Sequence, residues 1–149
     1  MTCGHCANFH KDVYPELKKD FIDKGLVKIE FRHFPLDLAA FNASKIGQCN
    51  NDGNSNIMHI LFSGQKKWAK GTPEEANGYL KKFLTDEGVK VDFEKCLADK
   101  SIEDYVLNDR IEGVKKFKVN ATPTIIINDK KFEKDINYKN LKKYLEKLI

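Results

Sequence analysis

Two cysteines separated by two residues lie near the start of the chain, in the segment Cys3-Gly4-His5-Cys6. A helical apolar pattern follows at once, so the pair is expected at a helix N-terminus. Unpaired amides and the positive end of the helix dipole lower the pKa of a thiol there, and the thiolate is the nucleophilic form of cysteine. We therefore expect Cys3 to attack substrate sulfur and Cys6 to resolve the mixed disulfide. His5 adds a donor or a positive charge that favours the thiolate and makes the disulfide more oxidising.

A second chemical feature lies far along the chain, where Ala121-Thr122-Pro123-Thr124 precedes a run of isoleucines. A cis peptide bond before Pro123 would turn the chain and leave the backbone carbonyl and amide of Thr122 free to pair with an extended peptide. We expect Thr122 and Pro123 to face the substrate. An ordinary trans proline at a strand start is the alternative.

The cysteine spacing leaves other kinds of site open. Two cysteines at this spacing are also half of a zinc site, to which His10 adds a ligand. A closed tetrahedral site usually takes a second local pair, and Cys49 and Cys96 lie far apart in the sequence. Four inert core cysteines are a further alternative, which two thiols at a helix start do not favour. We expect no metal and no organic cofactor.

Length and composition restrict the class of protein. The 149 residues suit one domain, and 41% hydrophobic and 32% charged residues are typical of a soluble globular protein. No apolar run approaches the roughly 18 residues of a membrane span, so no membrane insertion is expected. The net charge of +4 comes from 24 Lys and 2 Arg set among 22 acidic residues. Because nucleic-acid readers favour arginine and clustered basic faces, we expect no nucleic-acid partner.

A helix and a strand are predicted directly after the cysteine pair. The helix runs from residue 7 to about residue 24, Gly25 ends it, and Pro15 is expected to kink it because proline lacks the amide hydrogen. Residues 26–34 alternate between apolar and charged side chains, which predicts a strand near a sheet edge. The buried face of the helix is predicted from apolar residues at helical spacing, Phe9, Val13, Leu17 and Phe21.

Residues 37–117 contain no convincing strand and are predicted to form a series of helices. Asp37 caps the first helix, which the polar cluster at residues 50–54 ends, and residues 57–68 form the next. Thr72 starts another with a capping box, and a short helix follows around residues 93–97. A longer helix, capped by Ser101, is predicted to bury Ile102, Tyr105, Val106, Ile111, Val114 and Phe117.

The C-terminal segment returns to strand and then helix. Residues 124–127 are a continuous β-branched run, which predicts a strand covered on both faces. A turn at Asn128 and Asp129 leads to a short partner strand around residues 131–133. Asn137 then caps a closing helix.

The motifs together resemble those of the bacterial DsbA-like thiol:disulfide oxidoreductases. The resemblance runs across the whole chain and implies an α/β thioredoxin-like fold with an inserted helical domain. It divides the chain into a first thioredoxin-like part at residues 1–36, the insertion at 37–117 and a second thioredoxin-like part at 118–149. It is carried by Cys3-Gly4-His5-Cys6-Ala7-Asn8-Phe9-His10, Pro15-Glu16-Leu17, Phe34-Pro35-Leu36-Asp37, Trp68-Ala69 and Ala121-Thr122-Pro123-Thr124.

The same resemblance assigns roles to residues. It implies that Cys3 is the nucleophile, Cys6 the resolving thiol and His5 the tuning residue, with Thr122 and Pro123 on the substrate-facing loop. Alphaproteobacterial members keep a second cysteine pair in the insertion, which implies a structural disulfide between Cys49 and Cys96; unpaired buried thiols are the alternative. Such a disulfide persists in an oxidising compartment, so a periplasmic or otherwise exported protein is expected.

The resemblance also sets the expected activity and partners. We expect oxidation of cysteines in client proteins and reoxidation by a membrane or soluble redox partner. A disulfide isomerase or reductase using the same site, and a zinc-stabilised helical binding module, are the alternatives. Family members begin with a signal or anchor and a core strand that leads into the cysteine motif. We expect this chain to lack that first strand.

Overall fold

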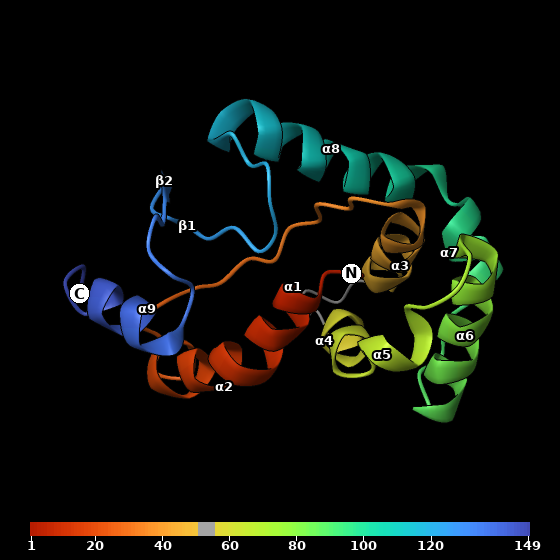
Figure 1. Cartoon of the computed structure of the whole chain (residues 1–149), viewed down its shortest axis with the longest axis horizontal. Coiled ribbons are helices and arrows are strands. Elements are labelled where there is room, and N and C mark those ends of the chain that lie inside the picture. The colour runs from red at the N-terminus through yellow and green to blue at the C-terminus, as the bar shows by residue number, and fades with distance from the viewer. Residues whose placement is uncertain (51–55) are drawn as a thin grey trace.

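A single helix-like rod carries the cysteine pair in the computed structural model, which describes residues 1–50 and 56–149. The rod, called here the redox helix, consists of α1 (Gly4–Asn8), η1 (Phe9–Val13), α2 (Tyr14–Leu17) and η2 (Lys18–Ile22), where η1 and η2 are π-helical turns. It lies between the helical insertion on one side and the C-terminal elements on the other (Figure 1). Its position therefore connects the two halves of the molecule.

Pro15 lies inside the redox helix without ending it. The wide turn η1 comes directly before α2, in which Pro15 is at the start. Proline lacks the amide hydrogen that an α-helical turn would use, and a π-helical turn is a common local adjustment to such an interruption. Gly25, with φ 70°, then ends the helix as predicted, because this left-handed conformation favours glycine.

The prediction of a strand at residues 26–34 is wrong, because this segment is extended (Figure 1) but forms no strand. Side-chain burial does alternate as expected, with Val27, Ile29 and Phe31 half-buried between exposed neighbours. However, the sheet in the described residues contains only β1 and β2, and residues 27–36 make no backbone ladder with any described segment. Alternation decides which side chains face the protein, but a strand forms only where a neighbouring segment supplies hydrogen bonds.

Helices make up the insertion in the part of the chain that the structure describes. Asp37 and Thr72 cap α3 and α6 as predicted, and Thr72 forms the full capping box with Glu75. Ser101 does not cap α8; Asp99 does, by accepting bonds from the Ser101 and Ile102 amides. The break predicted at residues 50–54 falls almost wholly outside the described residues. The helices are α3 (Leu38–Gln48), α4 (Asn56–Ser63), α5 (Gln65–Trp68), α6 (Pro73–Asp86), α7 (Phe93–Ala98) and α8 (Lys100–Phe117).

The insertion has its own hydrophobic core around Trp68. The Trp68 side chain is fully buried, and its indole nitrogen donates to the Leu61 carbonyl at 2.8 Å. Gly64 divides the helix predicted at residues 57–68 into α4 and α5, and a Cβ there would lie 2.0 Å from the Phe83 ring. Glycine is therefore needed where α6 packs closely against this turn. Other members of the core are Ala43, Ile46, Cys49, Leu80, Leu84, Phe93 and Cys96.

The prediction that α8 buries an apolar face is largely wrong. Val106 is the one residue of this helix classed as buried. Tyr105, Ile111 and Val114 are instead 46%, 48% and 46% exposed. Helical spacing identified residues that share a face, but not whether another element covers that face.

The C-terminal segment forms a short hairpin and a helix. Strand β1 (Ile126–Ile127) pairs antiparallel with β2 (Lys130–Lys131), and Asn137 caps α9 (Tyr138–Leu145) as predicted. The isoleucine run is not covered on both faces as expected, since Ile125, Ile126 and Ile127 are half-buried. The redox helix and α9 bury a second core together, formed by Phe9, Val13, Leu17, Phe21, Phe132, Leu141 and Leu145.

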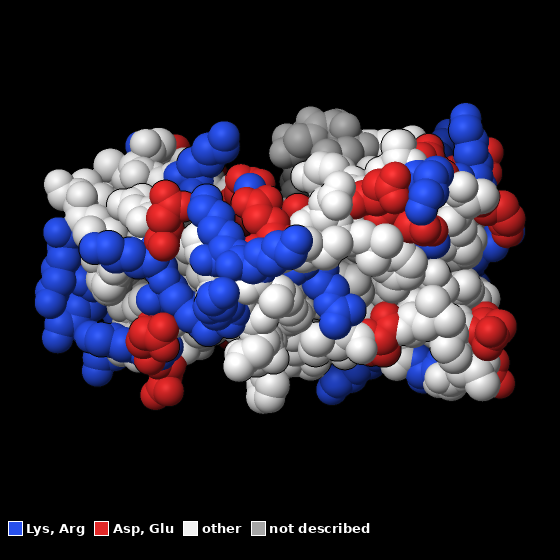
Figure 2. All heavy atoms as spheres, turned by 90° about the horizontal axis from the view of Figure 1, so that it is seen from above, with Lys and Arg blue, Asp and Glu red and all other residues white. Residues whose placement is uncertain are grey.

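Charged side chains cover much of the exterior, and lysines gather over the end that carries the hairpin and α9 (Figure 2). Within the described residues, no helix combines the length and apolar character that a membrane crossing requires.

Candidate active site

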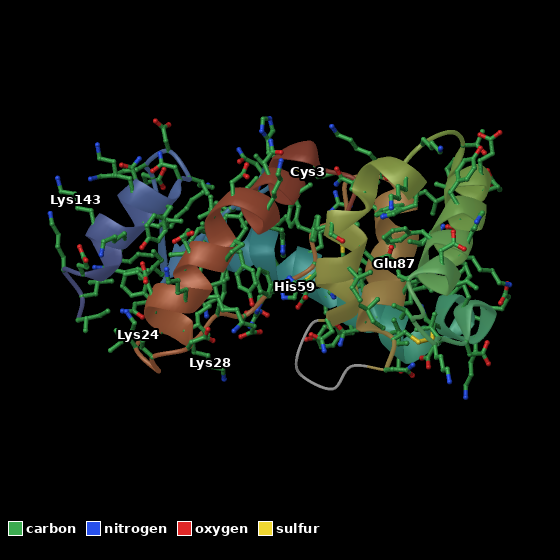
Figure 3. All side chains as sticks on the ribbon, turned by 90° about the horizontal axis from the view of Figure 1, so that it is seen from below. Cys3, Lys24, Lys28, His59, Glu87 and Lys143 are labelled. Carbon is green, nitrogen blue, oxygen red and sulfur yellow. A yellow bond between two sulfur atoms is a disulfide. The ribbon has the colours of Figure 1, made fainter. Side chains whose placement is uncertain are left out.

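Cys3 is the N-cap residue of the redox helix. Its sulfur accepts a hydrogen bond from the Cys6 amide, with Sγ 3.3 Å from the nitrogen, and lies 3.4 Å from the Thr122 carbonyl oxygen. Figure 3 shows Cys3 at the end of the redox helix that faces the insertion. Two segments separated by more than a hundred residues thus meet at this sulfur.

Hydrogen bonding lowers the pKa of Cys3 below its ordinary value. Partial burial by itself would raise the pKa, but bonds from the Thr122 side chain and from the Cys6 thiol and amide outweigh it, and the His5 amide adds to them. Donors at a helix N-terminus stabilise negative charge at the sulfur. Cys3 is therefore the thiol that ionises first.

Cys6 has the opposite electrostatic environment. Burial raises the pKa of the Cys6 thiol to about 12, and the hydrogen bond and negative charge of neighbouring Cys3 add to the effect. A thiol with so high a pKa stays protonated at neutral pH, and Cys3, whose pKa is lowered, is the first of the two to ionise. The pair thus consists of one thiol that ionises more readily than an ordinary cysteine and one that stays protonated, and the two are not joined in this structure.

Alkylation of Cys3 is expected to show an ionisation midpoint below about 8.5, the ordinary cysteine value. Thiolate is the reactive form, so the rate rises with pH through that midpoint and falls as the pH drops below it. Thr122→Val removes the hydroxyl that bonds to the Cys3 sulfur and should raise the midpoint. Thr124→Val is the control: the Thr124 hydroxyl donates to the Ala121 carbonyl, so its loss should leave the midpoint unchanged. Iodoacetamide kinetics on the reduced protein would measure this; equal midpoints in both variants would contradict the role of the Thr122 hydroxyl.

The structure brings the sequence-predicted loop to the cysteines. The Thr122–Pro123 peptide bond is cis, and both residues line the same cavity as Cys3 and Cys6. The cavity has a volume of about 770 Å³, and its walls include residues 26–34 and the isoleucine run of β1. His5 is exposed, and its imidazole makes no hydrogen bond to another described residue.

Cys49 and Cys96 lie away from this site. They form a disulfide between the end of α3 and α7, with a Cα–Cα distance of 5.8 Å, inside the core of the insertion. Cys49 is 3% and Cys96 is 5% exposed, so a client thiol has no direct approach to the bond.

Gln65 is a site residue that sequence reasoning missed. It is buried, and its side-chain nitrogen donates to the Cys3 carbonyl at 2.9 Å and to the Met1 carbonyl at 2.6 Å. The insertion therefore holds the backbone at Cys3. No local pattern around Gln65 marks it, because the contact joins residues that are distant in the sequence.

His10 and His59 form a second polar contact between the redox helix and the insertion. Their Nδ1 atoms are 3.1 Å apart, and the rings are packed against Phe31, Phe62 and Tyr14. Burial, and to a lesser extent His59, lowers the pKa of His10 to about 4. The pair is thus neutral at neutral pH and joins the two halves one turn beyond Cys6.

A zinc centre finds no support in the geometry. Within residues 1–50 and 56–149, no three or more His, Cys, Asp or Glu side chains converge in a way that could hold a metal ion. His10 turns toward His59 rather than completing a set with the cysteines. Structural zinc takes four such ligands, so the zinc-stabilised module is not supported.

Comparison with known proteins identifies relatives that match almost the whole chain. Residues 1–147 match the family model described as thioredoxin. A Rickettsia bellii protein, provisionally named a protein-disulfide oxidoreductase, is 30% identical over 134 residues, which are 85% of this chain and 49% of that protein. Disulfide bond formation protein D of Bacillus subtilis is 29% identical over 157 residues, covering 97% of this chain and 67% of that protein. The chain spans about half the length of the Rickettsia relatives.

Solved structures agree with the sequence relatives. The crystal structure of Wolbachia pipientis alpha-DsbA1 superposes with a TM-score of 0.83 at 28% identity, covering 99% of this chain and 80% of that one. The architecture is accordingly a thioredoxin fold with an inserted helical domain. This chain is a member of the thioredoxin family, of the DsbA-like kind.

Proposed function

We propose that this protein is a thiol:disulfide oxidoreductase that oxidises cysteine pairs in client proteins through a Cys3–Cys6 disulfide. The observation that carries the proposal is the Cys3 sulfur, held at a helix N-terminus with a lowered pKa and lying 3.4 Å from the carbonyl of Thr122. Such a sulfur is a good nucleophile and a good leaving group. The names of the relatives agree with this chemistry.

The reaction transfers two electrons from the client to the protein. A client thiolate attacks Cys3 of the oxidised pair, a client–Cys3 disulfide forms, and Cys6 leaves and takes up a proton. The second client thiolate attacks the client sulfur of that mixed disulfide and releases Cys3 as a thiolate. The client gains a disulfide, and the protein holds one thiolate and one thiol. Because the lowered pKa of Cys3 stabilises this product, it makes the disulfide more oxidising than one whose thiol has an ordinary pKa.

The cavity beside Pro123 is where the client peptide would bind. An extended segment can pair with the exposed backbone of Thr122 and place its own sulfur against Cys3. The clients are therefore proteins with reduced cysteines in accessible, extended segments, and the compartment is an oxidising one outside the cytosol. A separate redox partner must remove the two electrons before the next cycle.

Incubation of the oxidised protein with a reduced peptide that holds two cysteines tests the proposal. We expect one peptide disulfide to form for each protein disulfide that is reduced, as measured by mass spectrometry. A reduction potential near about −120 mV would support an oxidase, and one near about −270 mV would support a reductase instead. Absence of peptide oxidation by a fully oxidised, folded protein would refute the assignment.

A further inference from the structure

The outer face of α8 carries an uncovered apolar stripe. Leu107, Ile111 and Val114 are 37%, 48% and 46% exposed. Their spacing of four and three residues places them on one side of the helix. All three belong to the exposed large apolar side chains of the described residues, and in Figure 1 α8 lies at the outside of the molecule.

The C-terminal segment that follows this stripe is strongly basic. Residues 115–149 contain ten lysines, no arginine and four acidic residues, whereas the rest of the chain has a slight excess of acidic residues. Of these lysines, only Lys116 and Lys142 pair with a carboxylate within the described residues. Most of this positive charge is therefore uncompensated at neutral pH.

The basic residues come from three elements that lie side by side. Lys131 of β2 donates to the Lys118 carbonyl just beyond α8 at 3.4 Å, and Lys116 pairs with Asp129 of the hairpin turn at 3.4 Å. The hairpin packs on α9 through its edge-to-face aromatic contact. Figure 2 shows lysines gathered over this part of the α8 side, and Figure 3 shows Lys143 pointing away from the body of the molecule. We call the lysine-rich surface formed by residues 115–149 the basic end.

We propose that the basic end and the α8 stripe together bind the surface of an anionic lipid membrane. Lysines near a membrane attract anionic headgroups without a dedicated pocket, and an adjoining apolar stripe enters the boundary between headgroups and acyl chains. The protein has both features next to each other, because the apolar stripe ends at Val114 and Lys115 and Lys118 follow it at the end of α8. This property goes beyond the proposed thiol chemistry and does not depend on it.

Other anionic partners fit the region less well. Nucleic-acid phosphates are usually read by arginine forks in a groove, and this segment has no arginine. An apolar stripe adds nothing to binding a phosphate backbone. An acidic protein would need a defined complementary face, whereas these lysines lie on flexible stems spread over three elements.

Vesicle sedimentation with the 149-residue chain tests the proposal. We expect binding to mixed phosphatidylcholine and phosphatidylglycerol vesicles and none to pure phosphatidylcholine. Binding should weaken steeply as salt rises, because salt screens charges beyond about 10 Å at 0.1 M. Glycerol phosphate at a matched phosphate concentration should not release the protein, and release by it would point to a single phosphate site and overturn the proposal.

Two variants and a matched control separate the contribution of the lysines to vesicle binding from that of the apolar α8 stripe. Changing Lys115, Lys118 and Lys130 to Gln should weaken vesicle binding about a hundredfold, at roughly a factor of five per lysine. Changing Lys66, Lys67 and Lys70 of the insertion to Gln removes the same charge and should have little effect. Ile111→Ser with Val114→Ser should cost about tenfold through lost apolar contact. Circular dichroism would verify that each variant is folded.

Several outcomes would overturn the inference. They are equal binding to both vesicle types, binding to neither, equal losses in the two lysine variants, and tighter binding to duplex DNA than to the anionic vesicles. Client oxidation in solution is expected to be unchanged by the Lys115, Lys118 and Lys130 changes, so failure of this inference is distinguishable from failure of the proposed function.

Discussion

Cys3→Ala is expected to reduce catalysed oxidation of a two-cysteine peptide by on the order of 10³-fold or more, because no other described thiol can replace this nucleophile. Cys6 is half-buried, with its pKa raised to about 12, and Cys49 and Cys96 are joined in the core of the insertion. The loss should appear in kcat rather than in binding of the peptide. Turnover would be followed by thiol titration with glutathione disulfide as the terminal oxidant.

Cys6→Ala is the matched variant for this test. Cys3 remains reactive in it. When the variant is given the peptide in its disulfide form, the Cys3 thiolate attacks one peptide sulfur, the other peptide sulfur leaves as a thiolate, and the mixed disulfide should accumulate because Cys6 is absent and cannot displace the peptide. Non-reducing electrophoresis would display it as a dithiothreitol-sensitive band, which Cys3→Ala should lack. Full turnover in Cys3→Ala, or equal adducts in both variants, would contradict the assigned roles.

Removal of the second disulfide should produce the largest change in stability. The double change Cys49→Ala with Cys96→Ala opens a loop whose ends are 47 residues apart in the sequence. By the chain-entropy relation this costs about 4 kcal/mol, within the roughly 2–5 kcal/mol seen when native disulfides are removed from small proteins. Guanidinium unfolding of the folded variant, followed through buried Trp68, would measure the loss.

The reactive pair provides the control for that measurement. The double change Cys3→Ala with Cys6→Ala removes two half-buried thiols that are not joined, so it should change the free energy of unfolding by less than about 1 kcal/mol. If the Cys49 and Cys96 changes cost no more than this control, the disulfide is not a structural one.

Local features were the most predictable from sequence. Asp37, Thr72 and Asn137 cap helices because a side-chain oxygen bonds to amides two or three residues away, and that contact is decided within one turn. The prediction that Ser101 caps α8 was wrong. This too was decided within one turn, because the Asp99 carboxylate, two residues earlier, is a stronger acceptor for the same amides.

Long-range features were less predictable. The alternation of residues 26–34 correctly gave the side-chain pattern, but pairing depends on a partner that the segment itself does not encode. The bond from Gln65 to the Cys3 carbonyl joins segments 62 positions apart, and His10 meets His59 across 49. The cysteine motif and the Thr122 loop were predicted because their residue types are themselves chemically unusual.

The two π-helical turns of the redox helix determine how its ends are aligned. In an α-helix, residues four apart are rotated about 40° around the axis, so a row that starts at Phe9 would turn by about 120° before Phe21. Each wide turn cancels part of this rotation, and the row that includes Val13 and Leu17 stays straight along the core shared with α9. The wide turns therefore let one row of side chains, from Phe9 to Phe21, face the core shared with α9 along most of the redox helix.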